Sequence, residues 1–172
     1  MSIGMVFLGL TAAILILGAS IKLLTGPTRA AGALLAIVVF FAFFLLGSVV
    51  NVGSNEVGIV TRNAIGGNLS GGKIIATKGE KGVQADVLSP GYHFFYWPVL
   101  YTVKTVPLVE VRSDELALIE TADGIPLGEG QLFAPDWKPD EVQKMLDAKY
   151  FLTTGQGCKG KQATVLTPGK YR

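Results

Sequence analysis

The sequence predicts an α+β protein, in which an N-terminal transmembrane helical hairpin is followed by two related small β-rich modules. Three observations lead to this prediction. Residues 1–50 carry only two charged side chains and no acidic one. A block of thirteen residues, 79–91, recurs as residues 157–169 with nine identities. Short segments rich in β-branched residues, bounded by Gly and Pro, fill most of the remaining chain, which is typical of strands.

The first fifty residues contain two uncharged stretches, residues 3–21 and 30–50. A helix of about 20 residues crosses a hydrocarbon core of about 30 Å, so each stretch is long enough to span a membrane. Gly26 and Pro27 lie between them and form a strong turn signal. We therefore expect a tight transmembrane hairpin in residues 1–50, with its turn at Gly26 and Pro27.

Three other interpretations of this region stay open. A signal peptide begins with basic residues, and the first five residues contain none. Two core helices would need a larger partner domain than the remaining chain supplies. A re-entrant hairpin would enter and leave the membrane at the same face.

The charges near the two stretches bear on membrane orientation. Lys22 and Arg29 flank the expected turn, and the positive-inside rule places such a loop in the cytoplasm. The remaining chain would then lie on the extracytoplasmic side, which is the side that we favour. Arg62 follows the second stretch by only twelve residues and argues for the opposite orientation.

The internal repeat extends beyond its thirteen-residue block. Residues 55–60 also resemble residues 114–119. A self-match at a fixed offset indicates repeated structural units. We therefore expect a first module in residues 51–112 and a second in residues 113–172, with an insert of about twenty residues in the second.

The insert has the pattern of an amphipathic helix over residues 139–152. Val142, Met145 and Leu146 follow helical spacing, acidic residues lie in the first turn, and Gly155 follows the end. The expected strands are residues 57–61, 73–77, 84–88, 92–97, 99–106, 108–111, 116–120, 131–134 and 162–166.

Composition and motifs argue against several classes of function. Residues 51–172 hold thirteen basic and thirteen acidic side chains, so they lack the basic footprint that nucleic acid requires. Residues 67–73 fit the start of a P-loop, but Ile74 stands where a Ser or Thr would hold magnesium. His93 and Cys158, the only histidine and cysteine, supply at most two zinc ligands. We expect no catalytic residue, no cofactor and no metal.

An aromatic run is the strongest candidate for a functional surface. It follows the hairpin by some forty residues. Aromatic rings are favourable at the membrane interface, so we expect the run to contact lipid. A sheet core with a solvated edge is the alternative. The candidate membrane-interface residues are His93, Phe94, Phe95, Tyr96 and Trp97.

An ordered set of stretches follows the hairpin: residues 55–60, 82–84, 87–94 and 165–172. This set resembles the SPFH superfamily, also called band 7, which includes stomatin, prohibitin and flotillin. The similarity covers about residues 30–172 and is closest to bacterial flotillin-like proteins.

The resemblance implies SPFH-like modules behind an N-terminal anchor in a bacterial-type inner (plasma) membrane. It implies a non-enzymatic scaffold that forms a large homo-oligomeric ring or cage and organises a membrane microdomain or partner proteins. Membrane lipids and a membrane protease or another membrane protein are the implied partners. The aromatic loop of the family corresponds here to residues 93–97.

Two expectations qualify this resemblance. Family members continue into a charged coiled coil, whereas this sequence has no heptad segment and stops at Arg172, so we expect it to be part of a longer protein. A different class of function also stays open, namely a small accessory subunit of a larger transporter-type or secretion-type membrane complex. The number of copies per complex distinguishes this alternative from the scaffold.

Overall fold

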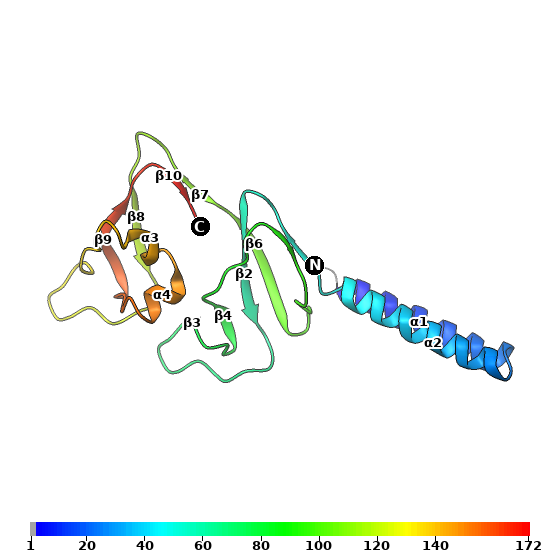
Figure 1. Ribbon diagram of the computed structural model, residues 1–172. Coiled ribbons are helices and arrows are strands. Elements are labelled where there is room, and N and C mark those ends of the chain that lie inside the picture. Colours follow the sequence, from blue (N-terminus) through cyan, green and yellow to red (C-terminus); the bar gives the residue numbers. More distant parts are fainter. Residues whose placement is uncertain (1–2) are drawn as a thin grey trace. The chain divides into compact units, whose positions relative to one another are not determined.

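A computed structural model describes residues 3–172 of the chain. It shows a mixed α+β protein with two apolar N-terminal helices and several small sheets (Figure 1). Contacts divide the chain into two units. The first contains the residues up to Asn51 together with Tyr92–Thr102, and the second contains Val52–Gly91 together with Val103–Arg172.

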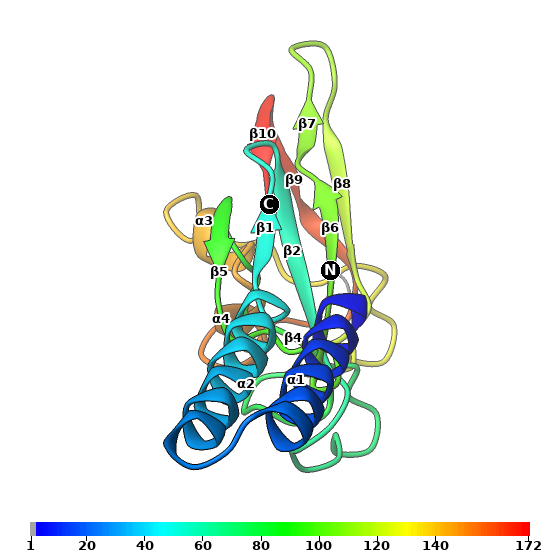
Figure 2. The same ribbon diagram turned by 90° about the vertical axis from the view of Figure 1, so that its right-hand side faces the viewer.

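Two helices, α1 (Ile3–Leu23) and α2 (Pro27–Leu46), lie side by side in the first unit (Figure 2). Both are long and apolar enough to cross a membrane. The second helix begins earlier than the expected span of residues 30–50, because proline is well suited to the first helical position. It also ends earlier, at Leu46, and the chain enters β1 from Val50 instead.

The turn between the helices is built by local interactions. Gly26 has a φ of 59°, a backbone conformation that favours glycine, and Pro27 begins α2. The guanidinium of Arg29 donates hydrogen bonds to the carbonyl oxygens of Ile21 (2.8 Å) and Leu24 (3.2 Å). Because the last carbonyls of a helix have no partner within it, these bonds cap the end of α1.

Small residues allow α1 and α2 to approach closely. A side chain added at Gly9 would overlap Phe43, and one added at Gly32 would overlap Ser20. A Cβ atom at Gly47 would lie 2.7 Å from Cγ2 of Val6. Glycine and serine at helix contacts are typical of helix pairs in membranes, where close packing replaces the hydrophobic effect.

The outer surface of the hairpin is apolar and uncovered. Leu15 and Leu23 are 73% and 81% exposed. Only 11% and 6% of the apolar segments of α1 and α2 are buried. Within the described residues 3–172, the two helices are therefore not core helices, and their apolar surfaces are available to lipid or to another protein.

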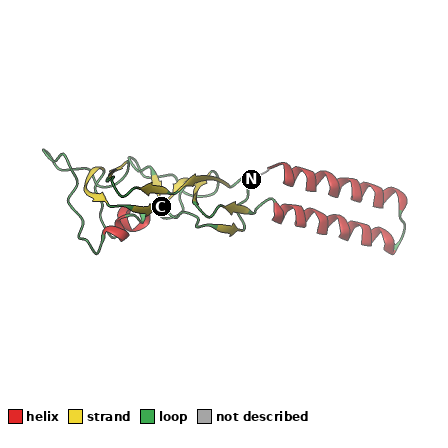
Figure 3. Cartoon of the chain, turned by 90° about the horizontal axis from the view of Figure 1, so that it is seen from above, coloured by secondary structure: helices red, strands yellow, loops and turns green. Residues whose placement is uncertain are grey.

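The strands are short and form one four-stranded and three two-stranded sheets, in the orders β3-β4-β2-β6, β1-β5, β10-β7 and β8-β9. Loops of very different lengths join them (Figure 3). Their bounds are β1 (Val50–Val52), β2 (Glu56–Arg62), β3 (Ile75–Ala76), β4 (Gly82–Gln84), β5 (Gly91–His93), β6 (Tyr101–Pro107), β7 (Val109–Val111), β8 (Ala117–Thr121), β9 (Gly160–Leu166) and β10 (Gly169–Tyr171).

Several expected strands are shorter than the sequence suggested. The strand expected at residues 84–88 ends at Gln84, and Leu88 forms only an isolated bridge with Gly58. The strand expected at residues 131–134 is reduced to one bridge, between Ala134 and Gln162. The frequent glycines with positive φ bend the chain within a few residues and leave little room for long ladders.

The internal repeat is reproduced in side-chain hydrogen bonds. The side-chain amide nitrogen of Gln84 donates to the carbonyl oxygens of Glu80 and Gly82, each at 2.8 Å. That of Gln162 donates to the carbonyl oxygens of Cys158 (2.8 Å) and Gly160 (3.0 Å). The two repeated blocks therefore fold into the same glutamine-closed turn.

Strand pairing follows the repeat as well. Gly58 lies opposite Leu88, and their counterparts Ala117 and Leu166 lie opposite each other in β8 and β9. The pair β7-β10 likewise repeats the pair β1-β5, although β7 lies in residues expected for the first module. One strand has no counterpart within residues 3–172, because β6 lies beside β2 whereas β8 pairs only with β9.

The insert does not form the single helix expected over residues 139–152, so that prediction is wrong. It forms α3 (Val142–Met145) and α4 (Ala148–Leu152). Asp147 separates them, because its backbone is extended and its carboxylate accepts hydrogen bonds from the first amides of α4, at 2.9 and 3.0 Å. The apolar spacing nevertheless identified the inner face, since Met145 is buried.

The close helix contact predicts how the hairpin responds to larger side chains. Gly9→Leu and Gly32→Leu should each destabilise it by about 1–3 kcal/mol, because the new side chain overlaps the facing helix. Tryptic cleavage at Lys22 and Arg29 in mild detergent should then become faster. Gly18→Leu is the matched control, because its Cβ meets no atom within 4 Å. Equal cleavage rates in all three variants would contradict the packing described here.

Candidate functional site

The end of α2 holds the aromatic run in place through Ser48, which is 1% exposed. The Ser48 hydroxyl accepts a hydrogen bond from the backbone N–H of Phe95 (3.2 Å) and donates one to the carbonyl oxygen of Leu45 (2.6 Å). The Ser48 carbonyl oxygen accepts a further bond from the N–H of Tyr96 (2.9 Å). Two backbone N–H groups of the run thus donate hydrogen bonds to Ser48, which lies just after α2.

Aromatic rings continue from α2 into the run. Phe40 stacks on Phe44 at 5.9 Å between ring centroids, and Phe44 stacks on Trp97 at 5.0 Å. Phe95 meets Trp97 edge-on at 6.0 Å. Phe40 and Phe44 belong to an apolar helix, so the same ring stack includes both a candidate membrane span and the run.

The run itself is divided between packed and exposed rings. Tyr96 and Trp97 are half-buried, and Tyr96 packs edge-on against Tyr101 at 5.4 Å. Phe94 and Phe95 are 58% and 62% exposed. The run is therefore neither wholly a sheet core nor wholly a free loop, because half of it packs and half of it presents apolar rings.

The backbone bend at Phe95 favours exposure of the Phe94 and Phe95 rings. Phe95 has a φ of 69°, which costs a residue other than glycine about 1–3 kcal/mol. His93 ends β5, and its ring lies 6.4 Å from that of Tyr96. The strand expected over residues 92–97 therefore stops at His93, because the bend at Phe95 takes the chain out of extended geometry.

Ser48 is the residue of this site that the sequence did not single out. It lies within the second uncharged stretch, between glycine and valine residues that give no polar signal. Its partners, Phe95 and Tyr96, are 47 and 48 positions away, so the contact exists only in the folded chain.

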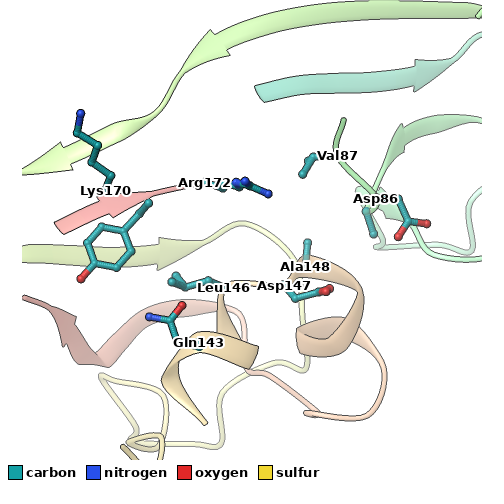
Figure 4. A pocket seen from close by; sticks show the side chains of 10 residues that line it. Asp86, Val87, Gln143, Leu146, Asp147, Ala148, Lys170 and Arg172 are labelled. Atoms are coloured by element: carbon teal, nitrogen blue, oxygen red, sulfur yellow. The ribbon is translucent and has the colours of Figure 1, made fainter. Parts of the chain in front are cut away.

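The second unit contains cavities with mixed linings. One, of about 620 Å³, lies between α3, α4, the segment around Asp86 and the end of the chain (Figure 4). Lys149 forms a salt bridge of 2.9 Å with Asp86, and both side chains are more than half exposed. Within residues 3–172, no three His, Cys, Asp or Glu side chains gather as a metal site would require. The P-loop-like segment 67–73 leads towards strand β3 rather than a helix.

A buried carboxylate joins the two modules. Asp123 is 8% exposed and accepts hydrogen bonds from the N–H groups of Ile74 (2.7 Å), Ile75 (2.8 Å) and Gly124 (2.8 Å). Burial by itself raises the pKa of Asp123, but the three backbone hydrogen bonds outweigh it and hold this pKa below its ordinary value. The ionised carboxylate of Asp123 therefore connects the second module to the backbone around the start of β3 through these hydrogen bonds.

Comparison with known proteins adds no family, because no protein-family model and no curated protein matches this chain.

The hydrogen bonds of Asp123 predict a pH-dependent stability. Asp123→Ala should lower the free energy of unfolding at pH 7 by about 1–3 kcal/mol, because it leaves two part-buried amides without their acceptor. Amide exchange at Ile74 and Ile75 should become faster. Because folding lowers the pKa of Asp123, its ionised form is stabilising above the ordinary value of 3.8, and the difference from the unsubstituted chain should shrink below that pH.

Asp86→Ala serves as the control for this prediction. Its side chain is 73% exposed in a surface salt bridge, so the substitution should change stability by less than about 1 kcal/mol. If Asp86→Ala lowers the stability as much as Asp123→Ala, the hydrogen bonds of Asp123 contribute no more stability than a surface salt bridge.

The aromatic run predicts contact between Trp97 and lipid. In liposomes of brominated lipid, Trp137→Phe, which leaves Trp97 as the only tryptophan, should show strong fluorescence quenching. Trp97→Phe, which leaves Trp137, should show weak quenching, because Trp137 packs against Phe151 at 5.8 Å within the second unit. Equal quenching of the two variants would remove the aromatic run as a membrane-interface site.

Proposed function

We propose that this chain is a subunit of a non-enzymatic, SPFH-like membrane scaffold. Copies anchor in a bacterial-type inner (plasma) membrane through α1 and α2 and assemble into a large ring or cage. The assembly organises a membrane microdomain or confines partner membrane proteins. The observation that carries the proposal is the attachment of the aromatic run to the end of an apolar helix by Ser48.

The attachment supports a membrane anchor because it continues an apolar surface. Phe94 and Phe95 are exposed and belong to the same unit as α1 and α2, whose apolar sides are uncovered. Aromatic rings at the end of a span are favourable at the headgroup level. Lys22 and Arg29 near the turn favour an extracytoplasmic position for the modules.

Open sheet edges support self-assembly. Three of the four sheets have two strands each, so their strands are edge strands, although Ala134 bridges the outer side of β9 at Gln162. Contacts between two different edges are heterologous, and they close into rings when the rotation between copies permits. A ring held together by such contacts needs no catalytic group.

The direct test is the size of the particle formed by the full-length gene product. After extraction in mild detergent, negative-stain electron microscopy and mass measurement should show closed rings or cages of many identical copies. Monomers, or one copy within an unrelated complex, would contradict the scaffold and would favour the accessory-subunit function.

A further inference from the structure

The two modules differ at one sheet edge. In the first module, β2 has β4 on one side and β6 on the other. In the second module, β8 takes the place of β2 and pairs with β9, and its other side has no strand within residues 3–172 (Figure 1). The strand position next to β2 is therefore occupied by β6 in the first module, and within the described chain the equivalent position next to β8 is empty in the second.

Backbone groups of β8 point towards this open side. Gly58 and Leu88 exchange two hydrogen bonds, of 3.0 and 2.8 Å, and Ala117 and Leu166 are their counterparts. Backbone groups alternate sides along an antiparallel strand, so those of the next residue, Leu118, point away from β9. An edge of this kind is a template for a further strand.

The side chains along this edge are unusual for a surface exposed to water. Leu116 and Leu118 are 66% and 82% exposed, and Val165, the partner of Leu118 in β9, is 38% exposed. Proteins normally protect open edges with proline, lysine or β-bulges. β8 contains neither proline nor lysine, and the register of its pairing with β9 shifts between Leu118 and Glu120. The edge and its apolar side chains therefore favour a covering strand.

Charge identifies which strand fits. The only charged residue within β8 is Glu120, and Asp114 and Glu115 precede it. A symmetric pair of two β8 strands is antiparallel and would bring these acids together, which is unfavourable. The only charged residue within β6 is Lys104, which is exposed and has no salt bridge within residues 3–172. Two β6 strands would likewise oppose two lysines.

We infer that β8 of one copy pairs with the outer edge of β6 of a second copy. The inference rests on the self-assembly proposed above and names its contact. β6 is the terminal strand of its sheet, is rich in β-branched residues, and already lies beside the counterpart of β8 within its own copy. Its lysine complements Glu120 within β8 and the acids that precede β8. Each copy then offers one edge of each kind, and the contact is heterologous.

The first arm of the test uses the full chain in mild detergent or liposomes. Leu118→Lys should reduce the assembled fraction about tenfold or more, because a lysine on an edge strand opposes strand addition. Leu132→Lys is the matched control, since Leu132 is 80% exposed in the same module but lies outside β8. An unchanged assembly of Leu118→Lys, or an equal loss in both variants, would overturn the inference.

The second arm locates the partner strand in a Cys158→Ala background. Leu118→Cys is mixed in turn with copies carrying cysteine at positions 103, 104, 105 or 106. Disulfides between copies should form at alternate positions, because successive side chains of a strand point to opposite faces. Disulfides between two Leu118→Cys copies would show a symmetric β8 pair instead. If the cysteines react with a thiol label, and so are accessible, but no disulfide forms, the inference is also overturned.

These outcomes separate the inference from the function on which it rests. If the unsubstituted chain forms no ring, the scaffold proposal fails. If the unsubstituted chain forms rings, but Leu118→Cys gives no disulfide with a β6 cysteine and Leu118→Lys assembles normally, the scaffold proposal stands. The β6-to-β8 contact is then wrong.

Discussion

The hydrogen bonds of Ser48 hold the aromatic run against the end of the helical hairpin. Two residues after Ser48, the chain enters β1, and two residues before Phe95 it leaves β5, the partner of β1. The bonds from Phe95 and Tyr96 to Ser48 therefore continue the β1-β5 pairing up to the end of α2. Without them, the positive φ of Phe95 would have no compensation, and the exposed rings would lose their fixed position.

The modules rely on closed turns because their apolar cores are small. Between Val52 and Arg172, buried apolar side chains are few and dispersed, and each intramolecular hydrogen bond contributes about 0.5–1.5 kcal/mol. The glutamine of each repeated block supplies two such bonds to its own turn, and the amide nitrogen of Gln162 also lies 3.0 Å from the hydroxyl oxygen of Thr121. The recurrence of the turn at Gln84 and Gln162 explains why this block is the best-matched part of the repeat.

Local patterns predicted the parts of the fold that depend on local physics. Hydropathy located both helices, and self-similarity located the paired blocks, because each signal is contained in neighbouring residues. The sequence did not predict contacts between residues that lie far apart in the chain. Asp123 acts on amides 48 and 49 positions away. Asp147 matched a helix interior as well as a cap, and only its extended backbone shows that it divides α3 from α4.

The asymmetry of the repeat is what would give the proposed assembly a direction. If both modules had the same sheet edges, each copy would offer the same contact twice. Copies could then add to one another in either of two orientations. Because β6 belongs to one module only, one edge of the chain is acidic and apolar and another carries lysine. A contact between unlike edges propagates head to tail, and such a series becomes a filament unless it closes. In the proposed assembly, anchoring of every copy through α1 and α2 would restrict the series to the membrane plane, where successive rotations about the membrane normal would close it into a ring.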